Sequence, residues 1–202
     1  MKPYPTIPKK VDRSISIYAW DKLDGSNIRA EWSKGSGWYK FGSRKRLLDE
    51  TDEHLGEAKQ LILATQAEQL EAIFRKQRWQ RVVAFFEFWG PNSFAGQHVD
   101  EEHQTTLIDV NPHKMGILTP REFRDLFSEL PIPALLYTGR VGPDFEQEVR
   151  SGTLPGLTGE GVVCKGVRKG RHLTMFKIKT DAWLERLRDF CKGDEKKFGQ
   201  LA

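Results

Sequence analysis

Short apolar stretches with a two-residue repeat alternate along this chain with longer stretches of helical period. Residues 14–20, 28–32 and 38–42 have the pattern of strands, and Lys34-Gly35-Ser36-Gly37 is typical of a hairpin turn. Residues 81–89 are almost wholly apolar and predict a buried strand. Further short strands are expected at 105–110, 135–137, 161–166 and 174–179.

Helical periodicity predicts a long helix over 53–77, with Thr51 or Asp52 as its cap. Thr119 and Pro120 are typical of a helix start, so a second helix is expected to run to about residue 130. Two more are expected at 143–150 and 181–192, and the charged tail at 193–197 should be solvated. Hairpins outnumber strand–helix–strand units, which predicts an α+β fold with antiparallel sheets.

Size and composition add few constraints. A chain of 202 residues suits one domain, and the net charge of +4 permits a polyanionic partner without requiring one. No apolar run is long enough to span a membrane, and the N-terminus lacks the apolar stretch of a secretory signal. Cys164 and Cys191 lie far apart and form no metal-type pair, so we expect a reducing, cytoplasmic setting.

The hexamer Lys22-Leu23-Asp24-Gly25-Ser26-Asn27 lies between two predicted strands. A lysine on such a turn can attack phosphorus only when it is unprotonated, so its pKa must be lowered by burial or nearby cations. Asp24 is expected to hydrogen-bond nearby backbone or hydroxyl groups, and Gly25 would let the chain approach a ligand closely. The alternative is a plain surface hairpin.

Glu87 interrupts the apolar strand at 81–89. A carboxylate in such a run is costly unless it is paired, so we expect it to face a cleft, the alternative being a solvent-facing strand position. The histidines show no metal-type spacing. His98 and His103 frame an acidic segment, for which a polar surface loop is a simpler interpretation than a zinc site.

Four further segments follow the hexamer in order: Phe41-Gly42-Ser43-Arg44, Phe86-Glu87-Phe88-Trp89-Gly90-Pro91, Glu160-Gly161-Val162-Val163-Cys164-Lys165 and Phe176-Lys177-Ile178-Lys179. Together with the hexamer they resemble the covalent nucleotidyltransferase superfamily of polynucleotide ligases and capping enzymes. Asn27 and the Phe-Glu-Phe-x-Gly-Pro segment are most similar to RNA ligases of the phage and RNA-editing type, since DNA ligases usually carry arginine where this chain has Asn27. The resemblance spans residues 22–179.

This resemblance implies an ATP-grasp-like ligase adenylation domain, with antiparallel sheets flanked by helices and no OB domain, covering 1–202 as one nucleotidyltransferase domain. It implies an ATP-dependent RNA ligase that forms lysyl-AMP at Lys22 and joins 5′-phosphate to 3′-hydroxyl ends. A separate accessory domain or protein would then help to hold the nucleic acid. Three alternatives stay open: a DNA ligase, an enzyme that stops at 5′-adenylylation, and a non-catalytic nucleic-acid-binding relative.

The resemblance also implies roles for residues near the phosphates. Lys177 and Lys179 alternate on one strand and would contact the α-phosphate of ATP while lowering the pKa of Lys22. Glu160 would bind Mg²⁺ or Mn²⁺, directly or through water. Lys165 lies five residues further on and is expected on the opposite face of its strand.

Other roles concern the nucleoside and the ends to be joined. Glu87 would accept from the ribose hydroxyls or hold metal-bound water, and Arg44 would contact the ribose or the 5′-phosphate. Asn27 would face the reacting phosphate, and Asp21 would help to read the base.

The chain departs from the family where an aromatic residue usually stacks on adenine, because the strand at 105–110 contains none. Leu107 or Ile108, or a ring from Phe85 or Phe88, is expected to replace it. Surface contacts with nucleic-acid phosphates are expected from a set of basic residues: Arg44, Lys45, Arg46, Arg168, Lys169 and Arg171.

Overall fold

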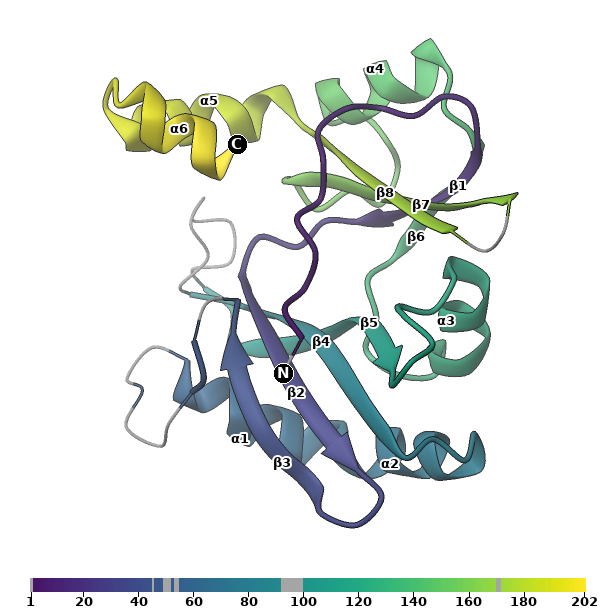
Figure 1. The fold of residues 1–202 in the computed structure, drawn as a ribbon. Helices are drawn as coiled ribbons and strands as arrows, with labels where there is room; N and C mark the ends of the chain where they lie inside the picture. Colours follow the sequence, from purple (N-terminus) through teal and green to yellow (C-terminus); the bar gives the residue numbers. More distant parts are fainter. Residues whose placement is uncertain (1, 45, 49–51, 53–54, 92–99, 170–171) are drawn as a thin grey trace. The chain divides into compact units, whose positions relative to one another are not determined.

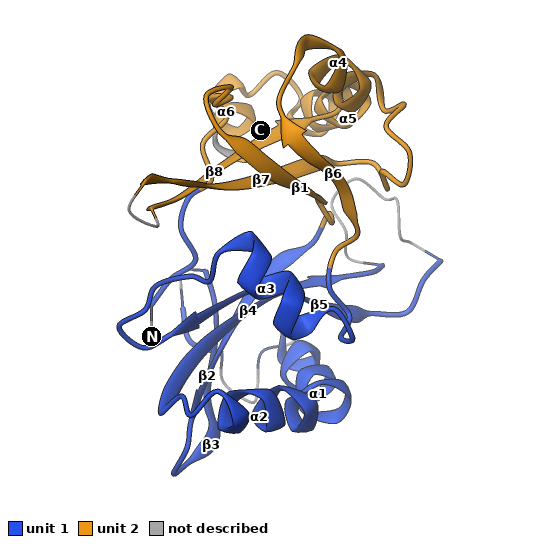
Figure 2. Ribbon diagram, turned by 90° about the vertical axis from the view of Figure 1, so that its right-hand side faces the viewer, with its two compact units in different colours: residues 1–6, 25–93, 98–132 blue, residues 7–24, 94–97, 133–202 orange. Residues whose placement is uncertain are grey.

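The computed structural model describes residues 2–202 except 45, 49–51, 53–54, 92–99 and 170–171. The chain forms two compact units, each built from separate stretches of sequence (Figure 2). Unit 1 contains the described residues of 1–6, 25–93 and 98–132, and unit 2 those of 7–24 and 133–202. The boundary between the two units therefore lies between Asp24 and Gly25, inside the hexamer of residues 22–27.

Unit 1 is built on a four-stranded antiparallel sheet with the order β3-β2-β4-β5 (Figure 1). The predicted strand at 81–89 is confirmed with the same bounds, and the strands predicted at 28–32, 38–42 and 105–110 are confirmed with longer ones. The strands are β2 (Ser26–Ser33), β3 (Gly37–Ser43), β4 (Arg81–Trp89) and β5 (Gln104–Pro112).

Aromatic side chains attach the helices of unit 1 to one face of this sheet. The ring of Phe74 lies 5.4 Å from that of Trp32 on β2 and 6.4 Å from that of Phe127, centroid to centroid. Trp32, Phe74 and Phe127 are fully buried, so α2 and α3 share a core with the sheet. The helices are α1 (Gly56–Thr65), α2 (Ala67–Lys76) and α3 (Pro120–Phe127).

The helix predicted over 53–77 is interrupted at Gln66, which separates α1 from α2. The buried side-chain amide of Gln66 donates to the Thr105 carbonyl at 2.7 Å and to Thr105 Oγ1 at 2.9 Å, a tertiary contact that helical periodicity does not show. The predicted cap Thr51 lies outside the described residues. The cap at Thr119 is confirmed: Thr119 Oγ1 accepts from the Glu122 N–H at 3.3 Å, and Glu122 Oε2 accepts from the Thr119 N–H at 2.9 Å.

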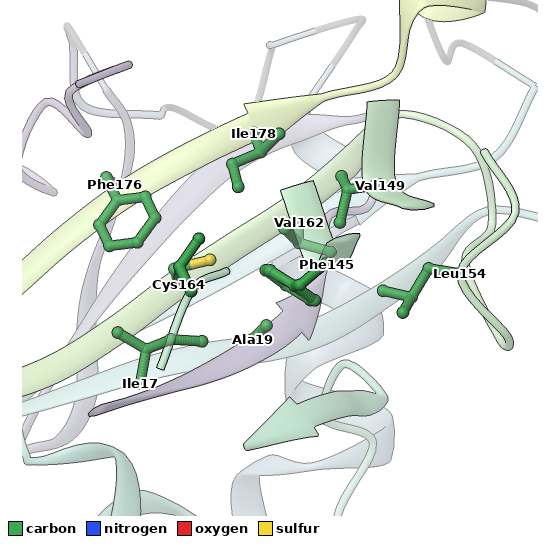
Figure 3. Packing of buried hydrophobic residues seen from close by; sticks show 10 residues of the cluster. Ile17, Ala19, Phe145, Val149, Leu154, Val162, Cys164, Phe176 and Ile178 are labelled. Atoms are coloured by element: carbon green, nitrogen blue, oxygen red, sulfur yellow. The ribbon is translucent and has the colours of Figure 1, made fainter. Parts of the chain in front are cut away.

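Unit 2 contains the second four-stranded antiparallel sheet, with the order β6-β1-β7-β8. Its apolar face packs against α4, where Phe145 and Val149 meet Ile17, Cys164 and other buried side chains (Figure 3). The elements are β1 (Ser16–Asp21), β6 (Leu135–Arg140), α4 (Pro143–Ser151), β7 (Gly161–Arg168), β8 (His172–Lys179), α5 (Asp181–Cys191) and α6 (Glu195–Leu201).

The segment 193–197 is exposed, as predicted, but the sequence did not predict helix α6, which begins within it. Asp194 caps this helix by accepting from the Lys197 N–H at 2.9 Å. Ala202 is buried in a cluster with Trp183, Leu187 and Cys191 of α5, and Phe198 packs against it. Although its sequence is rich in charged residues, α6 is a short amphipathic helix whose apolar side packs against α5.

Both sheets are antiparallel and carry helices, so the predicted α+β class is confirmed. In the part of the chain that is described, none of the helices has the length and apolar character needed to cross a bilayer.

Candidate functional site

Lys22 lies directly after β1, a central strand of the unit 2 sheet. Its backbone N–H donates to the Gly161 carbonyl at 2.9 Å, which holds the start of the turn beside β7. Its Nζ lies 2.8 Å from Oε2 of Glu160. The side chain of Lys22 is 21% exposed and that of Glu160 only 4%, so the amine can meet a solvent-borne molecule while the carboxylate lies behind it.

Glu160 bridges two lysines. Its Oε1 lies 2.9 Å from Nζ of Lys179, while its Oε2 pairs with Lys22. Burial alone would raise the pKa of Glu160, but the charges and hydrogen bonds of Lys22 and Lys179 outweigh burial and hold this pKa below its ordinary value. Glu160 is therefore ionised at neutral pH.

The loop that carries Glu160 is tied to the sheet on both sides. Asp21 accepts from the Thr158 N–H at 3.1 Å and from the Thr158 hydroxyl at 2.7 Å. The hydroxyl of Thr180 donates to the Gly159 carbonyl at 2.7 Å, and its N–H donates to the Glu160 carbonyl at 3.1 Å. Asp21 was expected to help read a base. Its buried carboxylate binds Thr158 and so orders the loop before Glu160.

The lysines of β7 and β8 lie on one face of the sheet. Val162, Cys164 and Ile178 belong to the apolar core, so the alternation of each strand puts Lys165, Lys177 and Lys179 on the opposite face. Lys165 was expected to face away from Glu160. It shares the face of Lys179, which Glu160 contacts, because Gly161 begins the strand at a φ of 142° and interrupts the regular alternation.

The electrostatic environment of Lys177 and Lys179 disfavours two full positive charges. Burial lowers the pKa of Lys177 to about 8, and the charges of Lys179 and Lys22 contribute in the same direction. Burial also lowers the pKa of Lys179 to about 8, although Glu160 opposes the shift. Within the described part of the chain, no hydrogen bond or ion pair engages the half-buried Lys177 ammonium.

Trp183 of α5 is a site residue that the motifs did not reveal. The Nζ of Lys179 lies 3.5 Å from the centre of its ring, and its Nε1 donates to Oδ2 of Asp24 at 3.3 Å. Both Asp24 and Trp183 are buried. The sequence predicted a helix over 181–192 but assigned no contact to Trp183.

Asn27 and Glu87 belong to unit 1, where they are directly opposed on β2 and β4. They share the sheet face opposite Trp32, which faces the helices. The side-chain amide of Asn27 donates weakly to the Phe86 carbonyl at 3.5 Å. Its Oδ1 is buried and accepts no hydrogen bond from the described residues, so it is an acceptor suited to a ligand donor.

Gly25 is the first residue of the stretch 25–93 of unit 1 and lies next to β4. A Cβ at this position would lie 2.3 Å from the Phe88 carbonyl oxygen, so glycine is required by the approach of the protein's own backbone. Arg44 is exposed at the end of β3.

Also in unit 1, the hydroxyl of Tyr4 donates to Oδ2 of the fully buried Asp109 at 2.5 Å. Burial and the charge of Asp109 raise the pKa of Tyr4 well above its ordinary value, an arrangement that no sequence motif indicated.

The side chains expected to stack on a base differ in their accessibility. Leu107, Phe85 and Phe88 are buried. Ile108 is half-buried and is therefore the most accessible of the four. Which of them meets a base stays a prediction.

The structure also shows the ion-pair partners of two arginines and one histidine. Arg46 pairs with Asp52, and Arg168 with Asp12, so neither is a simple solvated cation. His103 pairs through Nδ1 with Oε2 of Glu57 at 2.6 Å. Lys45, His98 and Arg171 lie outside the described residues.

No protein-family profile matches this chain, and no curated protein matches it. Solved structures do match. A mutant of Naegleria gruberi RNA ligase in its apo form has a TM-score of 0.65 and 17% identity, over 92% of this chain and 59% of that one. Another mutant, with ATP and Mn, has a TM-score of 0.65 and 17% identity over 91% and 59%. The same ligase with PPi has a TM-score of 0.64 and 16% identity over 87% and 52%.

These matches show that the chain has the α+β fold of this RNA ligase, as the sequence predicted. The chain spans between 52% and 59% of the length of these three ligase structures. The finer resemblance, to ligases of the phage and RNA-editing type, stays a prediction.

Proposed function

We propose that the chain is an ATP-dependent RNA ligase, acting as a nucleotidyltransferase domain over 1–202 and forming lysyl-AMP at Lys22. The observation that carries this proposal is the contact of Lys22 Nζ with Glu160, which also binds Lys179. A reachable amine next to an ionised buried carboxylate and further lysines, on a fold shared with an RNA ligase, suits attack on a nucleotide phosphate.

In the first step, Nζ of Lys22 attacks the α-phosphorus of ATP. A nitrogen–phosphorus bond forms, the bond from the α-phosphorus to the bridging oxygen breaks, and pyrophosphate leaves with that electron pair. The ammonium of Lys22 must first release a proton to water, because an ammonium has no lone pair with which to attack. Lys177, whose ammonium is not engaged by the described residues, is the proposed cation for the α-phosphate oxygens.

Glu160 is the proposed ligand for Mg²⁺ or Mn²⁺. Among the described residues, no group of three or more His, Cys, Asp or Glu side chains could hold a metal ion. A single carboxylate still fits Mg²⁺, which usually takes one or two carboxylates and completes its shell with water and substrate phosphates. Bound there, the ion would supply charge neutralisation at the phosphates. A Glu160 carboxylate that held the ion would no longer balance the charge of Lys22.

The later steps would join nucleic-acid ends. A 5′-phosphate oxygen takes the AMP phosphoryl group, which releases the amine of Lys22, and a 3′-hydroxyl then displaces AMP to form the phosphodiester. We propose RNA as the substrate, with Arg44 toward the 5′-phosphate or ribose and Glu87 toward the ribose hydroxyls. The Oδ1 acceptor of Asn27, which no described residue engages, supports a role for that residue at the ligand.

Incubation with α-labelled ATP and Mg²⁺ tests the first step. We expect a covalent label that is labile to acid and stable to alkali, as a phosphoramidate is, and no label from γ-labelled ATP. Lys22→Ala should take no label, while Lys34→Ala, at an exposed hairpin position, should label like the wild type. Equal labelling of Lys22→Ala and wild type would refute the proposed nucleophile.

Nicked duplexes test the substrate. The 3′-hydroxyl strand should end in ribonucleotides in one set and in deoxyribonucleotides in the other. We expect faster sealing of the ribonucleotide set, and equal rates would argue for a DNA ligase. A protein that binds nucleic acid in a salt-dependent way but takes no label would be a non-catalytic relative.

A further inference from the structure

Trp183 lies at the point where β8 passes into α5. Thr180 caps this helix, and its hydroxyl accepts from the Trp183 N–H at 3.1 Å. Trp183 is only 3% exposed and packs with Leu187 and Cys191. Its ring is thus fixed by the helix start and by its own apolar contacts, before any contact with the charged residues is considered.

The face of this ring holds the ammonium of Lys179. Nζ lies 3.5 Å from the ring centre, 2.9 Å from Glu160 Oε1 and 3.1 Å from the Leu201 carbonyl oxygen. An ammonium has three N–H groups, and these three contacts can engage all of them. A cation over the face of an indole is attracted by the negative charge of the ring face, most strongly when water is excluded.

The edge of the same ring reaches the turn that carries Lys22. The indole N–H donates to Oδ2 of the buried Asp24 at 3.3 Å. Asp24 is two residues after Lys22. The side chain of Trp183 therefore contacts both Lys179, which binds Glu160, and the turn that carries Lys22, the proposed nucleophile.

We propose that Trp183 is a positioning residue for adenylylation: its ring face holds Lys179 against Glu160, and its indole N–H holds the Lys22 turn through Asp24. The inference rests on the proposed function. A displacement of about 1 Å in such groups can lower a reaction rate by about a hundredfold, which is why a residue that does not touch the nucleotide can control the step.

A matched set of variants separates positioning from packing. Trp183→Phe keeps an aromatic face for Lys179 but loses the N–H for Asp24. Trp183→Leu keeps a smaller apolar side chain at this position and lacks both groups. Leu187→Ala damages the same apolar cluster and touches neither charged residue in the described contacts, so it reports the cost of packing alone.

The first measurement does not depend on catalysis. Competitive acetylation followed by mass spectrometry, at one pH for all variants, gives the reactivity of the Lys179 amine. The ring holds and covers this amine, so we expect Lys179 to react about fivefold faster in Trp183→Leu than in Trp183→Phe. Equal reactivity in these two variants would overturn the role assigned to the ring face.

The second measurement is the rate of label transfer from α-labelled ATP, at a temperature where circular dichroism shows each variant folded. We expect a loss of about tenfold for Trp183→Phe and about a hundredfold for Trp183→Leu, with the KM for ATP nearly unchanged. Leu187→Ala should stay within about twofold of wild type.

The outcomes are distinguishable from failure of the proposed function. If the wild-type protein takes no label, the ligase proposal fails, while the acetylation result still decides the contact with Lys179. If the wild type labels and Trp183→Leu labels as fast as Leu187→Ala, Trp183 only packs and the inference is wrong. Should Trp183→Leu not fold, Trp183→Phe against wild type decides it, and an unchanged rate overturns the proposal.

Discussion

Three ammonium groups, those of Lys22, Lys177 and Lys179, gather around the single carboxylate of Glu160. Lys22 and Lys179 each pair with one of its oxygens, while the charge of Lys177 is repelled by those of Lys179, Lys22 and Lys9. Such an arrangement costs folding free energy in the absence of an anion and favours the binding of one. We therefore expect the residues of the proposed site to lower the stability of the fold and to favour the binding of an anion.

The stability of a Lys177 variant tests this expectation. Its pKa is lowered from 10.5 to about 8 in the folded chain. The charged form therefore destabilises the fold below about pH 8, and this penalty disappears as the pH rises toward the unfolded pKa. After allowance for solvent screening, Lys177→Met should raise the free energy of unfolding by about 1 kcal/mol at pH 7, and by much less at pH 10.

Urea denaturation followed by tryptophan fluorescence at both pH values gives this free energy. Lys34→Met, in the exposed hairpin, is the matched control and should change little. A lower stability of Lys177→Met at pH 7 would contradict the expected repulsion.

Among the described elements, β7 begins with a closely confined backbone. Gly161 has a φ of 142°, and a Cβ there would lie 2.1 Å from the Ile178 carbonyl oxygen of β8. Both the left-handed φ and the close strand require glycine. The residue before it is Glu160, so the strand pairing and the proposed site depend on the same backbone geometry.

We expect Gly161→Ala to lower the free energy of unfolding by more than about 2 kcal/mol and to abolish labelling of Lys22. Gly35→Ala is the control. Apart from its chain neighbours, no atom of the protein lies within 4 Å of the position that a Cβ would take there, so the change should stay within about 0.5 kcal/mol. Denaturation midpoints and label transfer give the two readouts. A Gly161→Ala protein with wild-type stability would show that β7 can begin without this conformation.

Local signals predicted the elements unequally well. Thr119 and Pro120 predicted the start of α3, because capping is a contact between residues three positions apart. The interruption at Gln66 was missed because it depends on Thr105, which is distant in sequence. Helix α6 was missed because its stabilising partners, Trp183 and Leu187, belong to another helix.

At the scale of the whole molecule, unit 2 is assembled from two distant stretches of chain. β1 pairs with β6 on one side and with β7 on the other, so the stretch 133–202 lacks a central strand by itself. The Asp21 N–H donates to the Ala134 carbonyl at 2.8 Å, which shows that the end of the first stretch lies close to the start of the second.

We therefore expect residues 133–202 alone to be unfolded, and residues 7–24 joined to 133–202 by about six glycine and serine residues to fold. The dispersion of amide signals in a two-dimensional NMR spectrum distinguishes the two states. The joined chain should also keep the reactivity of Lys179 seen in the full chain. A dispersed spectrum from 133–202 alone would show that β1 is dispensable.

The sequence by itself determined which residues form most strands and where α3 begins, because alternation and capping act over a few neighbouring residues. It also placed Lys22, Glu160, Lys177 and Lys179 as candidates through the order of their motifs. Only the tertiary structure decided that Glu160 joins Lys22 to Lys179, since the antiparallel register of β1, β7 and β8 brings together residues up to 157 positions apart.

Tertiary structure likewise decided the contacts of Asp21 and Trp183 and the sheet face on which Lys165 lies. Asp21 binds Thr158, Lys165 shares the face of Lys179, and Trp183 contacts both Lys179 and Asp24. None of these follows from residue type or spacing. Each depends on which side of a strand or helix faces a distant partner, and that is settled only when the sheet and its helices pack together.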